Sequence, residues 1–263
     1  MAYLSSVGVV RQCDKSDLQV ISPLFAVPKR SGGYRLVHDV HVLNRHLSPP
    51  YFKQEDIRTV IDLIQPGDHM ITLDLSKCFH HIPVHVDDQR YLGFCLDGRY
   101  YKFTCLNFGL SASPYYNHKV LREVVKHLRL KGLRVVLFVD DFILMSQPGD
   151  IQSHTQILLE TLSDLGFFVN EEKSNLIPSS KVRYIGYDID TSGVHPVIRI
   201  PRDRVRRLRH AIRRSLKQDS ITARNLAKIA GQCVSMTQVI APGKLLLRNT
   251  YRLLGTCASW NSK

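Results

Sequence analysis

Two adjacent aspartates, Asp140 and Asp141, stand between two strongly apolar runs in the segment RVVLFVDDFILMS. Neighbouring ionised carboxylates repel each other, and neither apolar run can pair with them. A solvent-exposed turn would explain them, because aspartate is a common turn residue. The alternative is that they hold divalent cations at the tip of a buried hairpin, since such cations prefer oxygen ligands. The other carboxylates of the chain bear on this choice.

A third carboxylate, Asp74, follows the apolar run MITL. Two-metal phosphoryl transfer requires carboxylates from more than one strand, which hold two cations about 3.5–4 Å apart. An aspartate at a strand end can also be a simple cap or turn residue. Together with Asp140 and Asp141 and a strongly basic chain, Asp74 favours phosphoryl transfer on nucleic acid.

Short strands and amphipathic helices are expected to position these carboxylates. Residues 20–50 have the pattern of extended pieces broken by turns. Asp97-Gly98, between RYLGFCL and RYYKFTCL, predicts a hairpin with a type I′ turn. Periodicity predicts the remaining elements. Strands are expected over 70–75, 133–139, 142–146 and 181–190, and helices over 54–65, 114–131 and 151–165.

The composition changes near residue 198. The segment IRIPRDRVRRLRHAIRRSLK holds nine Arg or Lys residues and one Asp. An apolar stripe still runs through it, at Val205, Leu208, Ile212 and Leu216, which predicts an amphipathic helix with an arginine-rich face. A solvated charged face and contact with a nucleic-acid backbone are both consistent with this face, and its single sign favours the second. Two more helices are expected over 222–234 and 242–254.

The charge balance points to a polyanionic partner. The 263 residues carry a net charge of +13, which suits nucleic acid or an acidic membrane face. No apolar run approaches the ~20 residues that span a bilayer, and the N-terminus lacks a signal-peptide pattern, so we expect no membrane association. Six cysteines without a C-x-x-C pair indicate reduced thiols in an intracellular compartment, cytoplasm or nucleus, and no zinc site.

Several segments resemble the motifs of reverse transcriptases in order and approximate spacing. LDLSKCFHHIPV, FGLSASP, FVDDFILMS and YIGYDID are similar to the palm motifs, and SPLFAVPKRSGGYRLVHDVHVLN is similar to the fingers motif before them. The resemblance covers roughly residues 20–200. HHIPV, YKFTCLNFGL and LGFFVNEEKSNL are most similar to DIRS-type and gypsy-like retroelements.

The resemblance implies an α+β right-hand polymerase. Its parts would be fingers over 1–48 and 82–112, a palm with an antiparallel sheet and packed helices over 49–81 and 113–191, and a helical thumb over 192–263. The implied activity is that of an RNA-directed DNA polymerase. Such an enzyme extends a primer with dNTPs on an RNA or DNA template, using two Mg²⁺ ions for which Mn²⁺ can substitute.

The resemblance also implies roles at the catalytic centre. Asp74, Asp140 and Asp141 would hold the metal ions together with the backbone carbonyl of Leu75. Lys173 would protonate the leaving pyrophosphate. Five further residues would bind the incoming dNTP, with Phe79 as the aromatic gate that rejects a ribonucleotide. They are Lys29, Arg35, Phe79, Phe108 and Gly109.

Other residues would hold the template-primer duplex. Tyr184, Ile185 and Gly186 resemble the primer grip, which positions the primer 3′ end. The nucleic-acid backbone would contact a second group of side chains. They are Asn44, Arg206, Arg209 and Arg213.

Five positions depart from the family pattern. His41 replaces an arginine, Lys77 and Cys78 replace an Asp-Ala pair, Asn107 replaces a proline, and Asn117 replaces an aromatic residue. None of these changes removes a proposed catalytic carboxylate. They bear on rate and on template handling rather than on the class of reaction.

Two alternatives remain open. The first is a catalytically silent, domesticated relative that serves as a nucleic-acid-binding scaffold. The second is an RNA-templated RNA polymerase, which Phe79 disfavours. A ribonuclease H site needs its own carboxylates, and no Asp or Glu follows Asp219. We therefore expect that activity in another part of a longer polyprotein, from which this chain would be an excised core.

Overall fold

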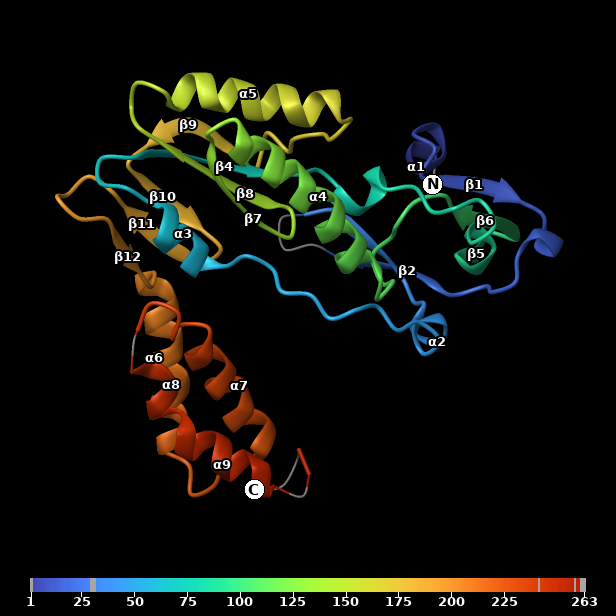
Figure 1. Cartoon of the computed structure of the whole chain (residues 1–263). Coiled ribbons are helices and arrows are strands. Elements are labelled where there is room, and N and C mark those ends of the chain that lie inside the picture. Colours follow the sequence, from blue (N-terminus) through green and yellow to red (C-terminus); the bar gives the residue numbers. More distant parts are fainter. Residues whose placement is uncertain (1, 29–31, 241, 258, 261–263) are drawn as a thin grey trace. The chain divides into compact units, whose positions relative to one another are not determined.

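The computed structural model describes residues 2–28, 32–240, 242–257 and 259–260 (Figure 1). The chain divides into two compact units. The first comprises residues 1–55, 72–144 and 152–176, and the second comprises residues 56–71, 145–151 and 177–263.

A four-stranded sheet carries the apolar runs that flank the aspartates. Its strand order is β7-β8-β4-β9. The strands are β4 (His69–Asp74), β7 (Arg134–Phe138), β8 (Asp141–Ser146) and β9 (Asn175–Ser179). Phe142, Ile143 and Leu144 in β8 are completely buried. A strand buried on both faces is a continuous apolar run, which explains why the sequence on either side of the aspartate pair does not alternate.

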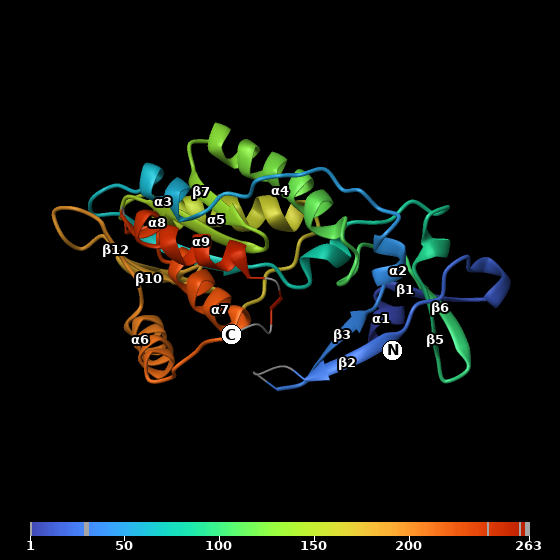
Figure 2. The same ribbon diagram turned by 90° about the horizontal axis from the view of Figure 1, so that it is seen from below.

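Two long helices accompany these strands, α4 (Ser113–Leu130) and α5 (Ile151–Asp164). Helix α4 packs along β7 (Figures 1 and 2). Pro114 lies in the first turn of α4, where its missing N–H costs nothing. After the helix, Gly132 takes a φ of 87°. Both helices were predicted from the sequence within a residue or so at each end.

The rest of the first unit consists of small antiparallel sheets and short helices. A three-stranded sheet has the order β1-β6-β5, and β2 pairs with β3 in a ribbon that Figure 2 shows well. Asp97 and Gly98 join β5 to β6 with φ values of 50° and 74°, which confirms the predicted type I′ turn. The elements are α1 (Ala2–Ser6), β1 (Val10–Cys13), η1 (Lys15–Asp17), β2 (Leu24–Pro28), β3 (Tyr34–His38), α2 (His41–Asn44), η2 (Cys78–His81), η3 (Gln89–Tyr91), β5 (Gly93–Leu96) and β6 (Arg99–Phe103).

The second unit holds α3 (Ile57–Leu63) and a sheet of β10 (Lys181–Tyr184), β11 (Tyr187–Asp190) and β12 (Val197–Arg199). The prediction of one continuous strand over 181–190 is wrong. Ile185 and Gly186, with φ values of 39° and 82°, reverse the chain between β10 and β11. The segment is therefore a tight hairpin.

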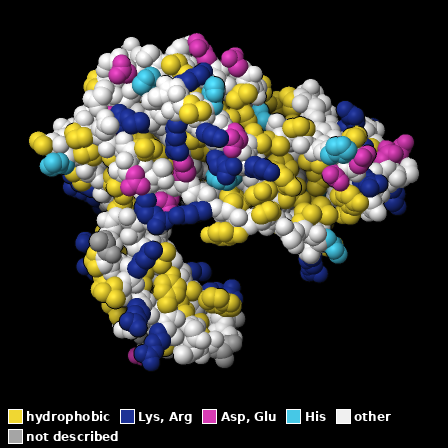
Figure 3. Space-filling view, in the orientation of Figure 1, with side chains coloured by type: hydrophobic (Ala, Val, Ile, Leu, Met, Phe, Trp, Pro, Cys, Tyr) yellow, Lys and Arg dark blue, Asp and Glu magenta, His cyan; other side chains and the backbone are white. Residues whose placement is uncertain are grey.

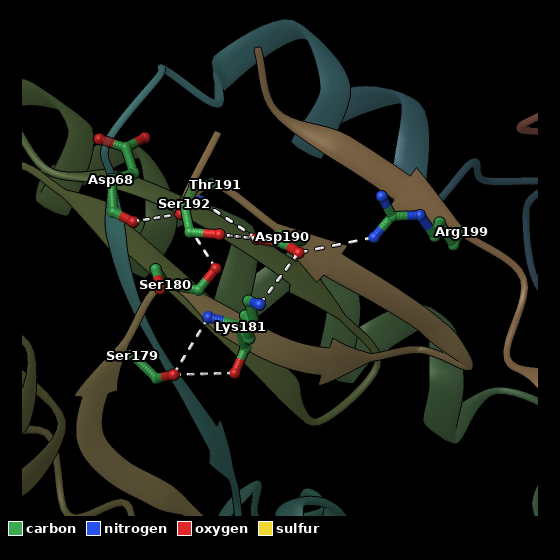
Figure 4. A network of polar contacts seen from close by, with 8 residues as sticks. All are labelled: Asp68, Ser179, Ser180, Lys181, Asp190, Thr191, Ser192 and Arg199. Atoms are coloured by element: carbon green, nitrogen blue, oxygen red, sulfur yellow. Dashed lines mark hydrogen bonds and ion pairs between the residues drawn. The ribbon is translucent and has the colours of Figure 1, made fainter. Parts of the chain in front are cut away.

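A polar network fixes the far end of this hairpin (Figure 4). The Asp190 carboxylate accepts hydrogen bonds from the backbone N–H and the hydroxyl of Ser192, which lower its pKa to about 2. Lys181 and Arg199 each lie 3.5 Å from the same carboxylate. Asp190 is thus held as a carboxylate between the two outer strands.

Four helices complete the second unit: α6 (Arg202–Leu216), α7 (Ala223–Val234), α8 (Gly243–Leu246) and α9 (Arg248–Thr256). Helix α7 packs against α6 and α9. The predicted stripe on α6 is half-buried at Val205, Leu208 and Ile212, but Leu216 is exposed. In place of the single helix predicted over 242–254 there are two helices, α8 and α9, with Leu247 in a turn between them. No helix in the described part of the chain is long and apolar enough to cross a membrane.

Candidate active site

The aspartate pair lies where β7 turns into β8. Asp140 is in the turn and Asp141 is the first residue of β8. Val139, which precedes them, has a φ of 61°. The Leu75 N–H donates to the Asp140 carbonyl oxygen over 3.0 Å. This bond ties the turn to the end of β4, whose last residue is Asp74. Carboxylates from two neighbouring strands are therefore brought to one place, as expected from the sequence.

The three carboxylates act on one another electrostatically. The pKa of Asp141 is raised to about 6, first by burial and then by the negative charges of Asp140 and Asp74. The Cys78 thiol beside them has a pKa raised to about 12, chiefly by its own burial and then by the charge of Asp140. The region therefore favours positive charge, and a bound cation would lower these pKa values.

Lys173 supplies one such positive charge. Its Nζ lies 3.4 Å from both carboxylate oxygens of Asp74. The turn that carries Lys173 is fixed against the end of β4 by two further bonds. The Asn170 N–H donates to the Asp74 carbonyl, and the Asp74 N–H donates to the Ser174 hydroxyl. The structure thus brings Lys173 together with the predicted carboxylates.

The donor set of this site suits hard divalent cations. Carboxylate oxygens are the ligands that Mg²⁺ and Mn²⁺ prefer, and half-buried carboxylates that repel one another are stabilised by bound positive charge. The Leu75 N–H is engaged with Asp140, and no donor in the described part of the chain is bonded to the Leu75 carbonyl oxygen. Among the described residues, no three acidic, His or Cys side chains form a complete metal-ligand group.

Phe79, five residues after Asp74 in the sequence, contacts Phe108. Their ring centroids are 4.9 Å apart, and Phe79 lies in the 3₁₀ helix η2. Phe79 is only 7% exposed. Two of the five residues predicted to bind the dNTP are therefore neighbours, and Phe79 is at the same time a core residue of the first unit.

Gly109 is required by the protein's own backbone. Its φ is +116°, and a Cβ at this position would lie 2.1 Å from the His38 carbonyl oxygen. The Asn44 side chain holds the same loop, because its amide donates to the Gly109 carbonyl and accepts from the Ser111 N–H, each over 2.8 Å. Asn44 thus has a structural role in shaping this loop, which sequence reasoning missed.

The predicted primer-grip residues are at the β10–β11 hairpin. Tyr184 is buried at the end of β10, and Ile185 and Gly186 form the turn. The Arg204 guanidinium of α6 donates to the Gly186 carbonyl and to the Ser235 hydroxyl. Arg204 was not singled out from the sequence, where nothing distinguishes it from the neighbouring arginines.

The remaining predicted residues are the cations expected to bind the dNTP and the nucleic-acid backbone. Lys29 lies outside the described residues, and Arg35 is within β3. Arg206, Arg209 and Arg213 are all exposed on α6. Figure 3 shows Lys and Arg side chains along the helical part that α6 to α9 form.

Three of the residues that depart from the family pattern make side-chain hydrogen bonds in the fold. His41 bonds to the Asp39 carboxylate over 2.9 Å. The Asn107 amide donates to Nδ1 of the buried His38 over 2.7 Å, and His38 Nε2 in turn donates to the Gly93 carbonyl. Asn117 donates to the Val139 carbonyl. The two asparagines are buried and serve the protein's own structure.

Comparison with known proteins identifies the family. The model of the family described as reverse transcriptase (RNA-dependent DNA polymerase) matches residues 27–189, more than half of the chain. The chain belongs to the reverse transcriptase family. This confirms the family expected from the motifs.

The relatives of this reverse transcriptase domain are polyproteins of retroviruses and retrotransposons. It is 30% identical over 186 residues to the Gag-Pol polyprotein of Rous sarcoma virus subgroup B (strain Schmidt-Ruppin), covering 67% of this chain and 11% of that protein. It is 27% identical over 179 residues to the Tf2-3 transposon polyprotein of Schizosaccharomyces pombe, covering 66% of this chain and 13% of the relative. The chain thus spans a small fraction of these relatives' length.

Solved structures share its fold. A foamy viral protease-reverse transcriptase in complex with double-stranded DNA matches 99% of this chain and 43% of its own, with a TM-score of 0.80 and 19% identity. The foamy viral protein in complex with an RNA/DNA hybrid matches 99% of this chain and 33% of its own, with a TM-score of 0.74 and 19% identity. The reverse transcriptase domain therefore has the right-hand polymerase fold that the sequence predicted.

Proposed function

We propose that this domain is an RNA-directed DNA polymerase that extends a primer with dNTPs by two-metal-ion catalysis. One observation carries the proposal. Asp74 ends β4 and Asp140 lies in the turn before the neighbouring strand β8, and the bond from the Leu75 N–H to the Asp140 carbonyl holds their backbones together. A nucleic-acid-binding scaffold would not need a half-buried carboxyl group such as Asp141, whose pKa is raised by burial and by the charges of Asp140 and Asp74.

The carboxylates of Asp74, Asp140 and Asp141 and the Leu75 carbonyl are the proposed ligands of two Mg²⁺ ions, with Mn²⁺ as a substitute. Bound there, the metal ions would activate the primer 3′-oxygen and stabilise the charge on the leaving pyrophosphate. The domain's own contribution would be to supply these oxygen donors from the end of β4 and from the turn and first residue of the neighbouring strand β8. Family membership supports divalent cations in general rather than a particular ion.

The proposed proton donor to the pyrophosphate is Lys173. Its Nζ lies 3.4 Å from the carboxylate of Asp74, which is one of the proposed metal ligands, and its side chain is largely exposed, so it can turn toward a bound triphosphate. Phe79 is the proposed gate against the ribose 2′-hydroxyl, with Phe108 and Gly109 beside the base. Lys29 and Arg35 are the proposed triphosphate contacts.

The proposed partner is a template-primer duplex of RNA and DNA. The foamy viral neighbours were solved with double-stranded DNA and with an RNA/DNA hybrid. On this domain, the proposed primer grip is Tyr184, Ile185 and Gly186, and the proposed backbone contacts are Asn44, Arg206, Arg209 and Arg213. We also propose the division into fingers (1–48, 82–112), palm (49–81, 113–191) and thumb (192–263).

The wider setting of the domain is part of the same proposal. Its relatives are polyproteins, so we propose that a separate segment supplies ribonuclease H. The motifs HHIPV and YKFTCLNFGL favour an origin in a DIRS-type or gypsy-like element.

Primer extension on an RNA template tests the activity. With Mg²⁺ or Mn²⁺, we expect incorporation of dNTPs and little of NTPs. Asp140→Asn should lower extension by at least about 10³-fold while duplex binding survives. The control is Asp87→Asn, which removes the same charge from a side chain that is 75% exposed. Near-normal extension by Asp140→Asn would contradict the proposal, and binding without extension by the unchanged protein would favour a silent scaffold.

Salt-dependent binding tests the duplex surface. Replacing Arg206, Arg209 and Arg213 with glutamine should weaken duplex binding at every sequence and reduce the log-log salt slope by about 3, or about 1 per lost phosphate contact. The control neutralises three exposed cations of α4, which are Lys119, Arg122 and Lys126. An unchanged slope in the α6 variant would place its arginines away from the duplex.

A further inference from the structure

The turn that presents the aspartate pair has an unusual backbone conformation. Val139 has a φ of 61°, in the left-handed region. A β-branched side chain strongly disfavours this region. Such a conformation persists only where surrounding groups hold it. The contacts of the Val139–Asp140 backbone therefore decide how firmly Asp140 and Asp141 are placed.

Two consecutive carbonyl groups of the turn are held from two sides. The Asp140 carbonyl accepts from the Leu75 N–H at the end of β4 over 3.0 Å. The Val139 carbonyl accepts from the Asn117 side-chain amide over 3.0 Å. The first bond joins the residue that follows β4 to the turn that precedes β8. The second comes from helix α4 and fixes the residue with the strained φ.

Asn117 is an unusual residue for its position. It is 1% exposed, and it shares the buried face of α4 with Leu121, Val124 and Leu128. Its Oδ1 is buried and has no hydrogen-bond partner in the described part of the chain. Burying an amide with an unsatisfied acceptor is unfavourable. Among the described residues, the hydrogen bond from Asn117 to the Val139 carbonyl is the side-chain contact that offsets part of this cost.

We propose that Asn117 is a positioning residue for nucleotide transfer. Its amide holds the Val139 carbonyl, and this keeps the turn in the conformation that directs Asp140 and Asp141 toward Asp74. The inference rests on the proposed function, because it concerns the same carboxylates.

Asn117→Leu is the direct test, since leucine has a similar volume and no donor. We expect kcat for dNTP incorporation to fall about 10- to 100-fold, because small displacements of catalytic groups cost this much. The KM for dNTP and the Kd for duplex should stay within about twofold. The control is Val124→Ala, which loosens the same buried face of α4 but leaves the Val139 bond intact.

A double-mutant cycle separates positioning from simple loss of packing. Glycine adopts positive φ without strain, so Val139→Gly should reduce the need for the Asn117 bond. We expect Asn117→Leu to lower kcat less in the Val139→Gly background than in the unchanged protein. Additive effects of the two substitutions would overturn the proposal.

Amide hydrogen exchange gives a readout that does not require catalysis. Asn117→Leu should speed exchange at residues 139–141, and Val124→Ala should not. If the unchanged protein fails to extend primers while this local effect is present, the proposed function fails, but the role of Asn117 in holding the turn of Asp140 and Asp141 stands. If exchange at the turn is the same in both variants, the positioning role is wrong whatever the activity.

Discussion

Replacing Asp141 with asparagine should stabilise the metal-free protein at neutral pH, although it removes a proposed metal ligand. Burial and the charges of Asp140 and Asp74 raise the pKa of Asp141 from 3.8 to about 6. The folded protein therefore holds the Asp141 proton more tightly than the unfolded chain does. Above that pKa, folding has to keep a half-buried negative charge beside two others.

The size of the effect follows from the shift. A rise of roughly two pH units corresponds to about 3 kcal/mol at 1.36 kcal/mol per unit. Because Asp141 is partly exposed, solvent screening reduces this to about 1–2 kcal/mol. The folded state binds more protons than the unfolded state between about pH 4 and 6, so the Asp141 contribution to stability falls as pH rises through this window. Below about pH 4 the carboxyl group is protonated in both states, and the difference vanishes.

Thermal unfolding in a chelator from pH 4 to 8 measures this contribution. At pH 7 we expect Asp141→Asn to raise the Tm by about 2–8 °C, and near pH 4 by little. Burial lowers the pKa of His38 and of His80, which makes the whole protein less stable on acidification. The comparison must therefore be made between variants at each pH.

Asp87→Asn is the matched control, because it changes the net charge equally at an exposed site. A cation that binds only the folded state stabilises it. Adding Mg²⁺ or Mn²⁺ should therefore raise the stability of the unchanged protein by more than it raises the stability of the Asp141→Asn variant. If Asp141→Asn is no more stable than Asp87→Asn at pH 7, the electrostatic reasoning about the site is wrong.

Three further predictions concern other parts of the molecule. Gly109→Ala should lower the free energy of unfolding by more than about 4 kcal/mol, because the new Cβ would meet the His38 carbonyl. Gly132→Ala, where a Cβ would enter open space, should lower it by about 1–2 kcal/mol. Equal losses for the two variants in denaturant unfolding would contradict this. Arg204→Leu should destabilise the protein by about 2–3 kcal/mol and speed amide exchange around Gly186, and unchanged exchange there would show that the Arg204 bonds do not hold the hairpin. Phe79→Val should lower the ratio of dNTP to NTP incorporation, and an unchanged ratio would exclude a gating role for this ring.

The parts of the fold that were predicted from the sequence rest on local patterns. The apolar runs around Asp140 and Asp141 and the run before Asp74 indicated strands, because continuous burial needs continuous apolar sequence. Asp97-Gly98 indicated its turn, because both residues tolerate positive φ. The Ile185-Gly186 turn was missed because isoleucine disfavours the left-handed region it occupies, and the surrounding residues alternate as in one strand.

The interactions that could not be predicted join residues far apart in the chain. Nothing in the local sequence links Asn44 to Gly109, or Asn117 to Val139. Arg204 contacts Gly186, but its neighbours in the sequence include other arginines of identical chemistry. Tertiary geometry alone selects which polar group receives each bond.

The buried pair of His38 and Asn107 constrains how this domain can change in evolution. His38 Nδ1 accepts the Asn107 amide, while His38 Nε2 donates to Gly93. Losing the asparagine alone would leave an imidazole nitrogen unsatisfied in the core, and losing the histidine alone would strand a buried amide. A change of both residues would therefore pass through a destabilised single variant, so the two positions should vary together among relatives. An apolar residue at position 38 is then expected beside a residue without an amide at position 107.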